Sequence, residues 1–239
     1  MTGEKRPPSR QLALSLPHDS AFGREDFVVS RVNAEAIAII DGWPDWPERG
    51  LLLVGPAGSG KSHLTAIWAT ATGAARIAAR RLGRDDAPAL VASGAVAVED
   101  LHDGPVDEPA LFHLVNTAAE QGARLLLTSR AGLATLPLKL PDLVSRLRAA
   151  RSITLGEPDD DLLRRVLTKL FADRQLVVDA AVIDFILLRM ERSLEAASLV
   201  VDRLDRDALA ENRSITKRLA GEALTRMAET QGLLWDGED

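Results

Sequence analysis

Residues 51–62 constrain the fold of this chain more than any other stretch. They read Leu-Leu-Leu-Val-Gly-Pro-Ala-Gly-Ser-Gly-Lys-Ser, an apolar run that leads into the pattern Gly-x-x-x-x-Gly-Lys-Ser. An apolar stretch with helical spacing follows, from His63 to Ala71. This order of strand, loop and helix is typical of a phosphate-binding loop, or P-loop, and predicts binding of a nucleoside triphosphate. The alternative is a glycine-rich turn that only joins a strand to a helix.

The residue types in the loop explain why it would hold phosphate. Gly55, Gly58 and Gly60 permit backbone conformations that a Cβ would obstruct, so successive N–H groups can face an anion. The helix that begins near Lys61 adds the positive end of its dipole. Lys61 can reach the β- and γ-phosphates, and the Ser62 hydroxyl can bind Mg²⁺. We therefore expect ADP or ATP, with Mg²⁺, to contact Gly55, Pro56, Ala57, Gly58, Ser59, Gly60, Lys61, Ser62 and His63.

Composition narrows the class of protein. The chain has 239 residues, of which 46% are hydrophobic and 27% charged, as in ordinary globular proteins. It has no cysteine, which excludes disulfides and thiolate metal sites. No stretch approaches the roughly 20 apolar residues of a membrane span, so we expect a cytoplasmic protein without membrane contact. A net charge of −6 argues against broad contact with a nucleic-acid backbone.

Apolar runs and helical periodicities alternate along the first two thirds of the chain. Strands are expected at residues 51–54, 75–79, 95–98, 124–128 and 152–155. Strands that alternate with helices predict a parallel sheet covered on both faces. After Gly156-Glu157-Pro158 the pattern is helical only. We thus predict a flexible segment at 1–20, an α/β nucleotide-binding subdomain with a five-stranded parallel sheet at 21–156, and a small all-α subdomain at 157–239.

Polar residues at two predicted strand ends extend the candidate site. Glu99 and Asp100 follow the strand at 95–98, where P-loop proteins need an acid to hold Mg²⁺ or orient water. The alternative is a pair of surface acids after a buried strand. Thr128 and Ser129 end the next apolar run, where a hydroxyl could contact the γ-phosphate or the attacking water. Strands often end in Thr or Ser without any such role.

The N-terminal segment contains a short motif of alternating leucines. Residues 11–17 read Gln-Leu-Ala-Leu-Ser-Leu-Pro, and prolines on both sides favour an extended conformation over a helix. One interpretation is a first strand, or a peptide that packs on its own domain. The other is a linear docking peptide whose glutamine and leucines fill a partner's pocket.

Together these features resemble AAA+ proteins with a helical lid and, among them, the DnaA initiator clade. Residues 27–33 (Phe-Val-Val-Ser-Arg-Val-Asn) are similar to that clade's segment near the adenine. Residues 140–147 (Leu-Pro-Asp-Leu-Val-Ser-Arg-Leu) are similar to its arginine-finger box, which implies that Arg146 is the finger. Residues 190–197 resemble its sensor II helix, which implies that Arg192 faces the phosphates of its own subunit. Without the resemblance, each arginine would be read as a solvated surface charge.

The N-terminal motif is similar to the sliding-clamp-binding motif of the Hda (HdaA) family, the DnaA-related regulatory inactivators. The resemblance covers about residues 10–230, and on its basis we expect no DNA-binding domain after the lid. It implies docking on the DNA polymerase sliding clamp through Gln11, Leu12, Leu14 and Leu16. DnaA would be the second partner, and Arg146 would act on ATP bound to DnaA. DNA would be reached only through the clamp.

Two other functions stay open at this point. The chain could be a self-contained AAA+ ATPase, a loader or remodeller, whose Arg146 acts within a homodimer or larger homo-oligomer. It could also be a nucleotide-bound scaffold without catalytic effect. Clamp binding, and dependence of hydrolysis on the initiator, discriminate among these hypotheses.

The acidic pair and the strand tip depart from the AAA+ pattern. Glu99 stands where the Mg²⁺ ligand is usually Asp, and Asp100 stands where a catalytic Glu is usual. Both carboxylates are displaced by a methylene, and a shift of about 1 Å can cost roughly 10²-fold in rate. Residues 128–130 (Thr-Ser-Arg) lack the Asp or Asn often found at the sensor I position. We therefore predict weak intrinsic ATPase activity and a tightly held nucleotide, ADP.

Overall fold

A single parallel sheet forms the centre of the chain. The computed structural model describes residues 23–235, so the predicted docking motif at 11–16 lies outside the described residues. The five strands pair in the order β2-β3-β4-β1-β5, all parallel, which confirms the fold prediction. They are β1 (Gly50–Val54), β2 (Ala75–Ala78), β3 (Ala95–Glu99), β4 (Arg124–Ser129) and β5 (Arg151–Thr154).

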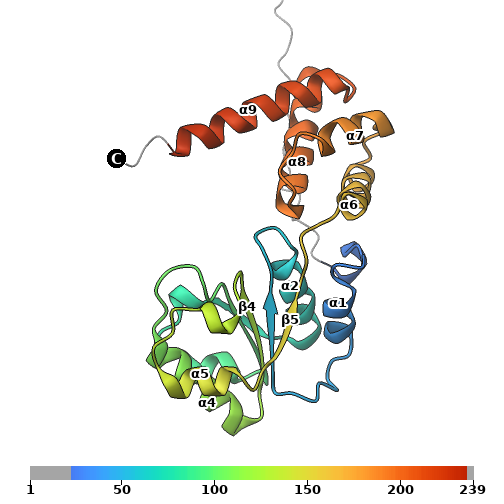
Figure 1. Cartoon of the computed structure of the whole chain (residues 1–239). Coiled ribbons are helices and arrows are strands. Elements are labelled where there is room, and N and C mark those ends of the chain that lie inside the picture. Colours follow the sequence, from blue (N-terminus) through green and yellow to red (C-terminus); the bar gives the residue numbers. More distant parts are fainter. Residues whose placement is uncertain (1–22, 236–239) are drawn as a thin grey trace, which may run out of the picture.

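Helices cover both faces of the sheet (Figure 1). On one face lie α1 (Ala34–Asp41) and α2 (Lys61–Thr72); on the other lie α3 (Ala87–Val91), α4 (Glu108–Gln121) and α5 (Pro141–Leu147). Because side chains alternate along a strand, β1 divides its residues between two cores. Leu51 and Leu53 pack with α1 and α2, and Leu52 and Val54 pack toward α4 and α5. All five residues of β1 are therefore buried.

Four helices follow β5 and form a lid with a core of its own. They are α6 (Asp160–Asp173), α7 (Ala180–Leu187), α8 (Leu194–Glu211) and α9 (Lys217–Trp235). Asp159, Asp179 and Ser193 each cap a helix, and each side chain accepts a backbone N–H from the first turn. In Figure 1 the lid lies beyond the end of the sheet toward which the β1 arrow points. Helix α9 extends past the other lid helices.

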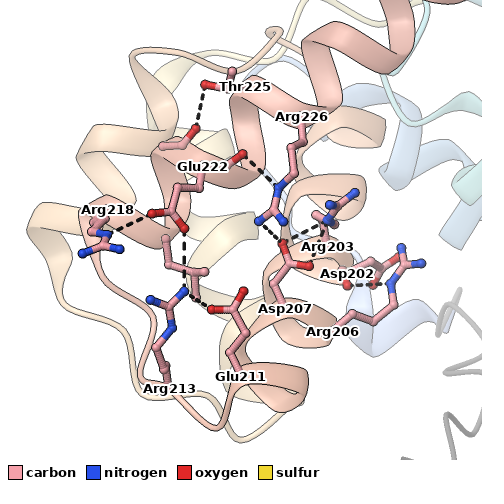
Figure 2. Close-up of polar contacts among 12 residues, drawn as sticks. Asp202, Arg203, Arg206, Asp207, Glu211, Arg213, Arg218, Glu222, Thr225 and Arg226 are labelled. Atoms are coloured by element: carbon pink, nitrogen blue, oxygen red, sulfur yellow. Dashed lines mark hydrogen bonds and ion pairs between the residues drawn. The ribbon is translucent and has the colours of Figure 1, made fainter.

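A network of ion pairs ties α9 to α8 on the lid surface (Figure 2). Asp207 of α8 accepts from Arg203 of the same helix and from Arg226 of α9, with N–O distances of 3.0 and 2.9 Å. Glu222 of α9 in turn pairs with Arg218 and with Arg213. The side chain of Asp207 is 15% exposed to solvent, whereas that of Glu222 is 39% exposed. The Asp207 contacts are thus the more sheltered part of the network.

The elements match the sequence expectations with small shifts at their ends. Residues 80–88, which the list of expected strands leaves out, contain the end of a 3-10 turn and the start of α3. α3 has five residues and a proline in its first turn, so it offers almost no periodicity to read. Within the described residues, no helix combines the length and apolarity needed to cross a membrane.

Candidate functional site

The predicted P-loop connects β1 to α2 and adopts a conformation that depends on glycine. Gly58 and Gly60 have positive φ angles of 65° and 98°, which only glycine adopts without strain. At Gly55 the limit is space, since a Cβ would lie 2.8 Å from the Ser59 hydroxyl oxygen and 2.9 Å from the carbonyl oxygen of Leu155. The geometry is that of a cradle whose walls a side chain would fill.

Lys61 is the first residue of α2, and its ammonium lies inside the loop. Its Nζ donates to the carbonyl oxygens of Gly55 and Pro56, at 2.7 Å in each case. The residue is only 7% exposed, and this burial lowers the pKa of the Lys61 ammonium. Asp100 opposes that shift, whereas the positive charge of Arg130 adds to it. The charges of Asp100 and Arg130 therefore both act on Lys61.

The other two helix residues assigned to the site lie outside the loop. Ser62 is exposed on the first turn of α2. The His63 ring packs edge-on against Phe27, with 5.2 Å between ring centroids, and its Nε2 lies 3.2 Å from the carbonyl oxygen of Gly23. Burial lowers the pKa of the His63 imidazole. His63 thus joins α2 to the segment before α1.

The two acids after β3 have different partners. Glu99 pairs with Arg76 of the neighbouring strand β2 at 2.9 Å. Asp100 has a positive φ of 61°, which turns the chain at the end of β3, and its N–H donates to Oγ1 of Thr128 at 2.9 Å. The Asp100 carboxylate raises the pKa of Lys61, so the charge of Asp100 acts on the P-loop lysine. The charge of Glu99 is balanced by Arg76.

The tip of β4 is bonded to the P-loop and to the turn after β3. The N–H of Gly55 donates to the carbonyl oxygen of Ser129 at 3.1 Å. The hydroxyl of Ser129 accepts the N–H of Ala131 at 3.1 Å, and both Thr128 and Ser129 are buried. The two hydroxyls singled out from the sequence therefore have bonds within the protein, to Asp100 and to Ala131.

The structure adds two residues at this tip that sequence reasoning did not assign to the site. Arg130 is exposed, and its N–H donates to Nδ1 of His102 at 2.9 Å. Burial and the charge of Arg130 lower the pKa of the His102 imidazole, so the neutral ring can accept this bond. Arg130 had a sequence signal, since it directly follows a predicted strand tip. His102 had none, because a histidine in a turn is common.

The lid touches the P-loop directly. The N–H of Leu194, the first residue of α8, donates to the carbonyl oxygen of Gly58 at 2.9 Å. A Cβ at Gly58 would lie 2.3 Å from Cβ of Ser193, so the absent side chain makes room for the lid. Arg192, predicted to face the phosphates, directly precedes this contact. Its guanidinium pairs with Asp160 of α6 at 2.8 Å, and about half of the Arg192 side chain is exposed.

Arg146 lies in the last turn of α5, apart from these contacts. Its helix is anchored in the core by Leu143 and Leu147, whereas Arg146 itself is exposed. Among the described residues, the Arg146 guanidinium has no ion pair and no hydrogen bond. Figure 1 shows α5 beside α4, on the face of the sheet opposite α1 and α2. The described residues thus leave this charge available to an anion outside the molecule.

The residues present fit a nucleotide but form no preassembled metal site. Within residues 23–235, no group of three His, Asp or Glu side chains could hold a metal ion. Mg²⁺ in nucleotide sites needs only one or two protein ligands, because phosphate oxygens and waters complete its shell. Ser62 and one carboxylate of the acidic pair are candidate ligands for such an ion.

The sheet, the P-loop and the helical lid together define a AAA+ fold of the DnaA type. Domain III of the Thermotoga maritima replication initiation protein DnaA matches with a TM-score of 0.74 at 16% identity, over 88% of this chain and 98% of that one. AMPPCP-bound DnaA from Aquifex aeolicus gives 0.58 at 19% identity, over 72% and 61%. A RuvB variant from Thermotoga maritima gives 0.65 at 16% identity, over 85% and 71%.

At these identities the likeness is one of fold. No protein-family model matches the sequence.

Proposed function

We propose that this chain is a cytoplasmic AAA+ regulator that stimulates hydrolysis of ATP bound to DnaA, as members of the Hda family do. The observation that carries the proposal is Arg146, an exposed guanidinium that has no partner within residues 23–235, on a core that resembles domain III of DnaA. In AAA+ assemblies an arginine of one subunit can reach the nucleotide of its neighbour. Such a finger stabilises charge that develops on the transferred phosphoryl group and can contribute about 10³–10⁵ in rate.

The chain's own P-loop would hold ADP or ATP with Mg²⁺. Lys61 would contact the phosphates and Ser62 the ion, while the lid, with Arg192, would close the site through its contact with Gly58. As the acid that holds Mg²⁺ or orients water, we favour Asp100 over Glu99. The charge of Asp100 acts on Lys61, whereas that of Glu99 is balanced by Arg76. Asp100 is also the shorter of the two acids. Because a shorter side chain displaces the carboxylate from the usual geometry, Asp100 supports weak intrinsic ATPase activity.

Clamp docking rests on the N-terminal motif. Gln11, Leu12, Leu14 and Leu16 would fill a pocket on the sliding clamp, and DNA would be reached only through that clamp. The result would be ADP-bound initiator wherever clamp remains on replicated DNA.

Hydrolysis of labelled ATP preloaded on DnaA tests the proposal. The reaction is followed with and without this protein, and with and without DNA-loaded clamp. We expect acceleration that needs the clamp and that disappears in Gln11→Ala and Leu14→Ala. A folded, nucleotide-bound protein that gives no acceleration would overturn the inactivator function.

A self-contained ATPase is the second candidate, and the fold of RuvB favours it. One matching structure is described as a Holliday junction branch migration motor. In that case Arg146 would act within a homo-oligomer, and hydrolysis would need neither initiator nor clamp. Rapid ATP turnover by this protein alone, with a steep dependence on its concentration, is the result that would support it.

A further inference from the structure

Glu108, the first residue of α4, is bonded to the start of α5, which lies 32 positions further along the chain. Its Oε2 accepts the N–H of Leu140 at 2.6 Å and the N–H of Lys139 at 2.9 Å. Its Oε1 lies 3.0 Å from the same Lys139 nitrogen. Because both donors are backbone groups, these bonds fix the path of the chain into α5. One carboxylate therefore joins the beginnings of two helices.

The sequence at the start of α5 explains why an acceptor from another helix is needed. Leu140 is the N-cap residue, and its hydrocarbon side chain cannot accept a backbone N–H as Ser, Thr, Asn or Asp would. Pro141 keeps Leu140 extended, with a φ of −78° and a ψ of 107°. Helices shorter than about 12 residues are marginal on their own, and α5 has seven. The Glu108 carboxylate supplies the acceptor that the N-cap of α5 lacks.

Apolar packing is the second attachment of α5. Leu143 and Leu147 are buried in the same core as Leu111 and Leu114 of α4. This packing holds the helix to the core, but it has no directional preference. Hydrogen bonds do have preferred lengths and angles, so they define where the helix begins. Glu108 thus fixes the position of α5 along α4, which leucine packing alone leaves loosely defined.

Arg146 is carried by this short helix. It lies between the two buried leucines in sequence, and its side chain is exposed. Figure 1 shows α5 as a short helix beside α4. At 3.6 residues per turn the helix has about two turns, so a displacement of its first turn also moves the turn that carries Arg146. A shift of about 1 Å in a reacting group can cost roughly 10²-fold in rate.

We propose that Glu108 is a positioning residue for Arg146. Its carboxylate holds the start of α5 in place, and this determines the direction from which the Arg146 guanidinium meets the nucleotide of its partner. The inference rests on the proposed stimulation of ATP hydrolysis on DnaA. It adds a residue of α4 that touches neither nucleotide nor partner and acts only through α5.

The test is the hydrolysis of ATP preloaded on DnaA, with DNA-loaded clamp and increasing amounts of this protein. The maximal rate and the half-saturating concentration are measured separately. Glu108→Ala should lower the maximal rate about 10- to 100-fold, as expected for a misplaced catalytic group. The half-saturating concentration should change by less than about twofold, because the exposed surface of α5 is retained. Glu120→Gln, an exposed acid at the other end of α4, is the matched control.

A conservative variant keeps the test valid if Glu108→Ala folds poorly. Glu108→Gln has the same shape but one acceptor oxygen, so it can hold only one of the two N–H groups. Its maximal rate should fall between those of wild type and Glu108→Ala. Hydrogen exchange of the α5 amides should rise in the same order and stay unchanged in Glu120→Gln. AMPPCP binding at the P-loop, measured by titration calorimetry, confirms that each variant is folded.

The outcomes separate this inference from the proposed function. Wild-type protein that gives no stimulation overturns the proposed function, and the role of Glu108 with it. Normal stimulation by wild type and an unchanged maximal rate in both Glu108 variants overturn the positioning role alone. A change confined to the half-saturating concentration also overturns it, since Glu108 would then serve only the binding surface.

Discussion

At the scale of single residues, Gly58 meets two demands at once. Its φ of 65° disfavours any side chain, and a Cβ would also collide with Ser193 of the lid. Gly73, at the end of α2, has a φ of 70° but open space around it. A comparison of Gly58 with Gly73 therefore separates the cost of backbone strain from the cost of a steric clash with the lid.

Alanine at these two positions should therefore have different costs. Gly73→Ala should lower the free energy of unfolding by about 1–2 kcal/mol, the cost of a left-handed conformation. Gly58→Ala should add about 1–3 kcal/mol for the collision, or displace the lid and weaken nucleotide binding. Urea denaturation and AMPPCP titration of both variants measure this. Equal losses in the two variants would mean that the lid contact carries no energy.

Two histidines predict how stability depends on pH. The pKa values of His63 and His102 lie below the ordinary value of 6.5, chiefly because of burial. As pH falls through about 6.5, the unfolded chain binds protons that the folded protein does not, so stability falls on acidification. The thermal midpoint should drop between about pH 7.5 and pH 5. His63→Gln should flatten this dependence, with His113→Gln, on an exposed part of α4, as the control.

At the scale of elements, the attachment of α9 to the lid depends on Asp207. Its carboxylate is bonded by arginines from both α8 and α9, and it is largely buried. Asp207→Asn should destabilise the lid by about 1–2 kcal/mol, because the remaining arginines lose a sheltered charged acceptor. Glu222→Gln, in the more exposed half of the network, should cost less than about 1 kcal/mol. Hydrogen exchange of the α9 amides distinguishes the two variants.

The sequence predicted elements better than the contacts between them. The strands were readable because parallel strands buried on both faces are continuous apolar runs, as in β1. The site was only partly readable. Adjacent acids in a sequence give no sign of which one acts on Lys61, because that depends on where each carboxylate lies in the folded protein. Arg192 pairs with Asp160, and Leu194 bonds to Gly58. Both contacts join residues more than thirty positions apart. Neither spacing nor composition encodes such contacts.

At the scale of the whole molecule, the proposed function divides labour between two parts of the chain. Arg146 lies on α5, whereas the expected clamp contacts belong to the N-terminal segment. Arg146→Ala should abolish the stimulation of ATP hydrolysis on DnaA while clamp binding is unchanged. Because Arg146 is exposed, folding should change by less than about 0.5 kcal/mol. Loss of clamp binding in the same variant would contradict the division.

The order of strands in the sheet also determines when the phosphate site can exist during synthesis. β1, which carries the P-loop, pairs with β4 and β5, and both are translated long after it. A nascent chain that ends before Arg124 has made neither neighbour of β1, and one that ends before Arg151 has made only one. The loop then lacks the carbonyl of Ser129 or that of Leu155, which flank Gly55. By this order, the proposed nucleotide would bind only after the sheet is complete, so its binding would report the end of sheet assembly and would not guide its start.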